Sequence, residues 1–204
     1  MKKKILLSIS LCALVASAMQ AQDQLADSIK QARAETDNTS QQLKATVRAL
    51  NQLTAQKKGD LRPAYNTFAE AVPKTATAAE TTAARVKWMD GDGQAYFKEW
   101  QDKITSIANE SLRKKSQKRL EAVRSSFDKV KGELKQASDK FKPFLSDLSD
   151  IQKTLEADVT AAGIKAVKPS VRSANTHFEA VDKEINAAIK EMDKMAKELS
   201  SEAK

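Results

Sequence analysis

Residues 120–155 read LEAVRSSFDKVKGELKQASDKFKPFLSDLSDIQKTL, and residues 164–199 read IKAVKPSVRSANTHFEAVDKEINAAIKEMDKMAKEL. In both segments the apolar side chains recur at alternating intervals of three and four residues, and each pattern persists for about five heptads. Such a repeat keeps one apolar stripe of a helix facing its partner helix. The two segments therefore predict two supercoiled helices, which pack antiparallel across a turn at Ala161-Ala162-Gly163.

The part of the chain before residue 120 predicts further helices. Residues 23–56 carry a weaker heptad pattern, in which threonines stand at several of the apolar positions. Residues 61–72 and 75–89 are expected to form short helices that end at Pro73 and at Asp90-Gly91-Asp92-Gly93. A long helix is then expected over residues 94–159, kinked rather than broken at Pro143, because the heptad phase continues across this proline. The return helix is expected over residues 164–200.

Together these segments predict an all-α fold, an elongated antiparallel helical bundle or coiled coil with three long helices and short helices at one end. No segment alternates with period two, so we assign no strands. The hairpin of the two longest helices buries too little apolar surface to offset the ordering of its backbone, so the helix of residues 23–56 or a homo-oligomer is expected to complete the core. We expect six aromatic side chains to gather at the end of the bundle distal to Gly163: Tyr65, Phe68, Trp88, Tyr96, Phe97 and Trp100.

Residues 1–21 have the layout of a secretory signal peptide. Three lysines at positions 2–4 precede an apolar run over residues 5–16, and small residues follow. We expect cleavage after Ala18 or Ala21, which leaves residues 22–204 as a single all-helical coiled-coil domain. The run is shorter than the roughly 20 apolar residues that span a bilayer, so we expect its removal rather than its retention as an anchor. No later stretch is apolar enough to span a bilayer, so no transmembrane segment is expected after cleavage. The expected location is the periplasm or cell envelope, and the only cysteine, Cys12, would be lost with the leader.

Positive charge is concentrated in one segment of the chain. The whole sequence has a formal net charge of +8, and residues 113–142 hold eleven Lys or Arg against four Asp or Glu. Such a segment attracts an anionic lipid, an anionic polymer or nucleic acid. Nucleic acid is not expected as a partner of an exported protein. A solvated helix face, with lysine head groups extending from apolar stems, accounts for the same pattern.

The heptad pattern fails just before residue 120. Continued upstream in the same phase, it meets polar residues at positions 106, 109, 113 and 116, whereas residues 97–107 carry an apolar stripe in another phase. The stretch 109–116 fits a polar layer that sets register, a hinge where the supercoil changes frame, or an open contact surface. For the contact surface, the candidate contacts to an anionic ligand or partner are Asn109, Arg113, Lys114, Lys115, Ser116 and Arg119.

Several short motifs within residues 96–195 stand out from the Ala- and Lys-rich background. They are Phe97-x-Glu99-Trp100, Asn109-x-Ser111-Leu112-Arg113-x-x-Ser116 with Leu120, Pro143-x-Leu145, Asp150 with Leu155, and Glu191-Met192. With these motifs the chain resembles a bacterial family, the domain of unknown function 2959. The resemblance implies an exported or lipoprotein helical protein of the envelope, without an assigned activity. The chain departs from the family in lacking a lipoprotein cysteine and in having Leu-Glu-Ala-Asp-Val-Thr at 155–160, where Leu-Lys-His-Asn-Leu-Asn is usual.

Few residues suggest a catalytic, metal-binding or ligand-binding site. The single histidine, His177, has no cysteine or second histidine near it in the sequence, so it does not begin a zinc site. Asp90-x-Asp92 lacks the later ligands of a calcium loop. Trp88 and Trp100 could form a stacking platform for a sugar, but aromatic side chains at a bundle end more often belong to the core. We expect no catalytic residue, no metal and no cofactor.

These observations favour an exported, non-enzymatic helical scaffold or adaptor that binds an envelope protein or an anionic envelope polymer. The alternative is a basic periplasmic holdase chaperone, or a protein that binds anionic lipid or polymer through residues 113–142. The two hypotheses differ in the expected salt dependence and breadth of binding.

Overall fold

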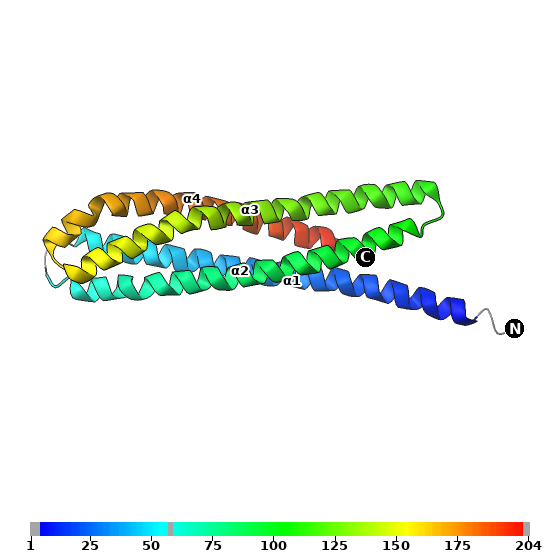
Figure 1. Ribbon diagram of the computed structural model, residues 1–204, viewed down its shortest axis with the longest axis horizontal. Helices are drawn as coiled ribbons and strands as arrows, with labels where there is room; N and C mark the ends of the chain where they lie inside the picture. The colour runs from blue at the N-terminus through cyan, green and yellow to red at the C-terminus, as the bar shows by residue number, and fades with distance from the viewer. Residues whose placement is uncertain (1–4, 57–58, 202–204) are drawn as a thin grey trace. The chain divides into compact units, whose positions relative to one another are not determined.

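The computed structural model describes residues 5–56 and 59–201, with side chains from residue 20 onward. Four helices follow one another along the chain (Figure 1): α1 (Ile5–Ala55), α2 (Arg62–Thr105), α3 (Glu110–Ala157) and α4 (Ala161–Ser201). The described ranges contain no strand. The all-α bundle prediction is confirmed, but the expectation of three long helices with short helices at one end is wrong, because all four helices are long.

The chain folds into two compact units, and every helix contributes a segment to each of them. The first unit consists of Met1–Arg33, Arg85–Lys131 and Glu191–Lys204, and the second unit consists of Ala34–Ala84 and Gly132–Lys190. Successive helices run in opposite directions (Figure 1), so helix segments that are neighbours in sequence are antiparallel within each unit.

The core of the second unit is one apolar cluster to which all four helices contribute. The residues from α1 include Leu43, Leu50 and Leu53, which confirms that the helix predicted at residues 23–56 helps to complete the core. The residues from α3 and α4 lie at the heptad positions that the sequence predicts. The larger buried side chains that α2, α3 and α4 contribute to this cluster are Phe68, Val72, Phe144, Leu148, Ile151, Leu155, Ile164, Val167, Val171, Val181 and Ile185.

Thr39 and Thr46, two of the threonines that interrupt the apolar pattern of α1, are buried and have hydroxyl partners on α2. Thr46 Oγ1 lies 2.7 Å from Thr75 Oγ1, and both side chains are fully buried. Thr39 Oγ1 lies 2.9 Å from Thr82 Oγ1. Because a buried hydroxyl is costly without a partner, these pairs explain how α1 tolerates threonine in its packed stripe.

Two expected interruptions of helix α2 are absent. Pro73 lies inside the helix, between the buried Val72 and Thr75. Packing on both sides of the proline offsets the loss of the backbone hydrogen bond that its missing N–H would have made. The helix also continues through residues 90–93, where Asp90 pairs with Lys131 at 2.5 Å. The short helices expected at residues 61–72 and 75–89 are therefore parts of one helix.

The long helix expected over residues 94–159 is also wrong, because a turn at residues 106–109 separates α2 from α3. The last turn of α2 tightens, with Ser106 N donating to Lys103 O at 3.1 Å. The change of heptad phase near residue 109 thus marks the junction of two helices. Pro143 does not break the helix, as expected, because α3 continues through it. The heptad phase also continues across this proline.

The connection between α3 and α4 lies slightly earlier than predicted. Residues 158–160 form the turn, and Ala161-Ala162-Gly163 begin α4. Thr160 Oγ1 accepts hydrogen bonds from Ala162 N at 3.2 Å and Gly163 N at 3.3 Å, which caps the helix. A Cβ at Gly163 would lie 2.0 Å from Asp158 O, so the turn requires glycine there.

The predicted gathering of the aromatic residues is wrong for two of them. Tyr65 and Phe68 pack in the second unit with Leu155 and Ile164, which flank the α3–α4 turn, and Tyr65 Oη donates to Gln152 O at 3.4 Å. The other four aromatic residues belong to the first unit.

The predicted leader, residues 1–21, falls mostly outside the residues whose side chains are described. Residues 1–4 lie outside the described ranges altogether, and residues 5–21 form the first part of α1. In the part of the chain that the structure covers, none of the helices combines the length and the apolar character needed to cross a membrane.

Candidate functional site

The stretch 109–116 forms the start of α3 rather than the middle of a helix. Asn109 Oδ1 accepts a hydrogen bond from Leu112 N at 3.1 Å, so Asn109 is the N-cap of α3. The Arg113 guanidinium donates to Ile107 O at 3.1 Å across the turn. These contacts exclude the interpretations of 109–116 as a buried polar layer and as a hinge inside one helix.

The side chains of this first turn of α3 point into solvent. Leu112 is 57% exposed, one of the two exposed large apolar side chains in the described ranges. Lys114 pairs with Glu110 at 2.6 Å, one helical turn away, and Lys115 is exposed. Four of the six predicted contact residues, Asn109, Arg113, Lys114 and Lys115, therefore lie on one exposed helix terminus, which we call the α3 start (residues 109–115).

The other two predicted residues, Ser116 and Arg119, line a hollow of about 320 Å³ between α2 and α3 in the first unit. Trp100 lies in its wall, where Nε1 donates to Ser116 Oγ at 3.2 Å. The Arg119 guanidinium lies 5.8 Å from the centre of the Trp100 ring. A cation next to an aromatic face stabilises both side chains, so this hollow has an ordered wall.

The α2 side of the hollow carries residues that the sequence analysis did not assign to a site. Tyr96 packs against Trp100 with ring centres 5.5 Å apart and ring planes tilted by 51°, and Lys103 pairs with Glu99 at 3.1 Å. The motif Phe97-x-Glu99-Trp100 is the feature of the sequence that points to these residues, because its spacing places Glu99 and Trp100 about one helical turn before Lys103.

The charge of the basic segment is distributed unevenly in the structure. In its later part, Lys129 pairs with Glu191 on α4 at 2.7 Å, and Lys140 pairs with Glu184 on α4. Residues 110–124, in contrast, hold six Lys or Arg against two Glu, a net charge of +4. The N-terminus of a helix adds partial positive charge. The excess positive charge is thus concentrated in residues 110–124, which include most of the α3 start.

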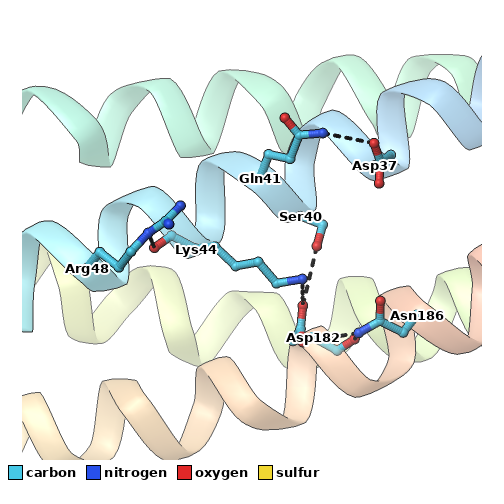
Figure 2. Close-up of polar contacts among 7 residues, drawn as sticks. All are labelled: Asp37, Ser40, Gln41, Lys44, Arg48, Asp182 and Asn186. Carbon is cyan, nitrogen blue, oxygen red and sulfur yellow. Dashed lines mark hydrogen bonds and ion pairs between the residues drawn. The ribbon is translucent and has the colours of Figure 1, made fainter.

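A second polar cluster lies between α1 and α4 in the second unit (Figure 2). Asp182 Oδ1 accepts from Ser40 Oγ at 3.3 Å and pairs with Lys44 at 3.0 Å, while Asn186 Nδ2 donates to Asp182 Oδ2 at 3.0 Å. Both carboxylate oxygens of Asp182 thereby have partners within the fold. The cluster ties two helices together, and we assign it a structural role.

His177 lies at the edge of the bundle, where its Nδ1 is 2.8 Å from Asp147 Oδ2 on α3. Among the residues whose side chains the structure describes, 20–56 and 59–200, His, Cys, Asp and Glu form no group of three suited to hold a metal ion.

A family model described as "Protein of unknown function (DUF2959)" matches residues 14–199. The chain therefore belongs to the domain of unknown function 2959 family. The match confirms the resemblance and extends it well beyond residues 96–195, to α1 and the first half of α2. No curated protein matches the sequence significantly.

Proposed function

We propose that this member of the domain of unknown function 2959 family is an exported, non-enzymatic helical scaffold or adaptor of the bacterial cell envelope, and that it binds an anionic envelope partner through the α3 start. The observation that carries the proposal is Leu112, an exposed leucine on a backbone that Asn109 and Arg113 already hold in place. An apolar residue on a preordered backbone loses no backbone entropy when a partner covers it, which favours binding.

The electrostatics support an anionic partner. The net charge of +4 over residues 110–124 and the helix N-terminus both attract negative charge toward Leu112. Exposed charges of this kind raise the association rate and make binding sensitive to salt, whereas the apolar contact resists salt. Binding by the adaptor should therefore weaken in high salt without being abolished.

The test is photocrosslinking in living cells. A photoreactive residue replaces Leu112 in one strain and Lys153, an exposed residue of α3 in the second unit, in a control strain. We expect one discrete adduct from position 112 and none from position 153. Equal adducts at both positions, or none at position 112, would overturn the proposal that the α3 start is the binding surface.

A second candidate function is a basic periplasmic holdase, or a protein that binds anionic lipid or polymer. The net positive charge of residues 110–124 favours this second candidate as much as it favours the adaptor. Sedimentation with phosphatidylglycerol vesicles and with phosphatidylcholine vesicles separates the candidates. Binding to the anionic vesicles alone that disappears in 1 M salt, where the Debye length falls to about 3 Å, supports the lipid binder. A broad smear of crosslinked proteins supports the holdase.

Export is part of the proposal and has its own test. A cleaved leader predicts a mature protein that begins at Met19 or at Gln22, depending on whether cleavage follows Ala18 or Ala21. Mass spectrometry of the protein from an envelope fraction reads this N-terminus directly. A chain that retains residues 1–18 in the cytoplasmic fraction would contradict export.

A further inference from the structure

We propose that the first unit carries a binding site for a neutral pyranose oligosaccharide, with Trp88 as its stacking platform. The site is a hollow of about 800 Å³ between residues 20–31 of α1 and residues 85–92 of α2, and of its lining residues only Gln20 would be lost if cleavage follows Ala21. It shares no lining residue with the hollow beside Trp100 and does not depend on the adaptor function proposed above.

Trp88 is held in place and yet exposed. Its side chain is 61% exposed, which corrects the expectation that it belongs to the core, whereas Tyr96, two turns later on α2, is only 5% exposed. The Arg85 guanidinium lies 4.7 Å from the centre of the Trp88 ring, and Arg85 also donates to Gln31 Oε1 at 2.9 Å. The contact with Arg85 orients the indole, and the exposure leaves ring surface for a ligand.

The far end of the hollow is fixed by a second set of bonds from α1 to α2. Asp92 Oδ1 accepts a hydrogen bond from Gln24 Nε2 at 2.7 Å, and Asp92 Oδ2 accepts one from Ser28 Oγ. Spacings of three and four residues place these side chains on the facing sides of the two helices. Trp88 therefore lies between two bonded positions, in a hollow whose walls are preordered.

The chemistry of the lining fits a sugar. A pyranose presents apolar C–H groups on one face, which stack on an aromatic ring, and hydroxyl groups around its edge, which need donors and acceptors. Trp88 supplies the ring, while the exposed carboxylates of Asp23 and Asp27 supply acceptors within the same hollow. Ligand sites typically combine an apolar surface with a few such polar groups.

The same lining is poorly suited to a protein partner. Aromatic anchors of protein interfaces lie among other apolar side chains that exclude water. Around Trp88 the lining consists of carboxylates, amides, a hydroxyl, basic groups and one glycine. Three aspartates face Arg85 and Lys87 there, so the charges nearly cancel. This balance favours a neutral saccharide over an anionic polymer.

The test is calorimetric titration of the full chain without its leader. The probes are chitohexaose, which carries acetamido groups as cell-wall glycan does, and cellohexaose and maltohexaose, which do not. We expect at least one probe to bind with a Kd of about 0.1 to 1 mM. Trp88→Ala should weaken binding about tenfold or more, because it removes the stacking surface. Trp88→Phe, which keeps a flat face, should retain most of the affinity.

Two further variants test the polar part of the site. Asp27→Asn should weaken binding, whereas Glu80→Gln, a matched change at an exposed carboxylate of α2 outside the hollow, should not. Thermal unfolding followed by circular dichroism checks that each variant folds, which the exposure of Trp88 and Asp27 leads us to expect. If no probe binds below about 10 mM, or if Trp88→Ala binds as well as the wild type, the proposal is overturned. Capture of a protein by a photoreactive residue at position 88, with no saccharide binding, would overturn it in favour of a protein interface.

Discussion

The backbone at Gly93 passes directly against the ring of Phe127, so that a Cβ at Gly93 would lie 2.3 Å from the ring Cζ. Phe127 is buried and makes an edge-on contact with Phe97, with ring centres 5.5 Å apart, so its ring has little room to withdraw. Glycine is therefore needed here for the close approach of α2 and α3. This need explains why Gly93, one residue of the turn-like Asp90-Gly91-Asp92-Gly93 segment, lies inside a helix.

The first prediction concerns the glycines of this segment. Gly93→Ala should destabilise the protein by about 1 to 3 kcal/mol, because the new methyl group overpacks the site. Gly91→Ala, two residues earlier on the same helix, meets no atom within 4 Å and should stabilise by about 0.5 to 1 kcal/mol through helix propensity. Urea unfolding measures both changes. Equal effects of the two substitutions would contradict the packing role of Gly93.

The second prediction concerns the buried threonine pair between α1 and α2. Thr46→Val or Thr75→Val alone should cost about 1 to 3 kcal/mol, because each leaves the other hydroxyl without its closest partner. The double variant should cost less than the sum of the two. Thr77→Val, at an exposed position of α2, serves as the control and should change stability by less than about 0.5 kcal/mol. Strictly additive effects would show that the hydroxyl pair is not coupled.

The third prediction concerns acid stability. Glu184 on α4 is 6% exposed and pairs with Lys140 on α3. The hydrogen bond from Lys140 lowers the pKa of Glu184 below its ordinary value of 4.5, and this effect outweighs burial, which raises the pKa. A carboxyl group with a lowered pKa in the folded state stabilises the fold above its unfolded pKa. This stabilisation is lost as the pH falls through the folded pKa.

Glu184→Gln should therefore flatten the loss of stability that the wild type shows as the pH falls below 4.5. It should also lower stability at neutral pH, because Lys140 loses its partner. The measurement is a series of urea unfolding curves from neutral to acidic pH. Glu179→Gln, at an exposed position of the same helix, should leave the pH profile unchanged. A variant at Glu184 with the wild-type pH profile would contradict the assignment.

The heptad pattern predicted the residues that pack, because periodicity reports directly which face of a helix is buried. Leu120, Leu155, Ile164 and Leu199 are all buried as expected. Helix ends were harder to predict, since local composition competes with tertiary contacts that the sequence does not display. Pro73 lies in a continuous helix because its neighbours are packed.

The candidate sites, like the fold, could be predicted from the sequence only in part. The break in heptad phase drew attention to residues 109–116, because a polar residue in a packed stripe is visible in the sequence, but it did not predict that a new helix begins there. The exposure of Trp88 could not be predicted, since hydrophobicity alone assigns a tryptophan to the core. Only the register between α1 and α2, which places Gln31 beside Arg85 and Gln24 beside Asp92, shows that Trp88 faces a polar hollow.

The last prediction separates the structural role of Asn109 from the proposed contact role of its neighbours. Asn109→Ala removes the side-chain acceptor for Leu112 N and should destabilise the protein by about 0.5 to 2 kcal/mol in urea unfolding. Asn109→Ser keeps an N-cap oxygen and should restore most of this loss. Lys115→Ala removes an exposed charge and should change stability by less than about 0.5 kcal/mol, while it lowers crosslinking from position 112 at low salt. If Lys115→Ala leaves the crosslink unchanged at low salt, the positive charge of the α3 start does not attract the partner.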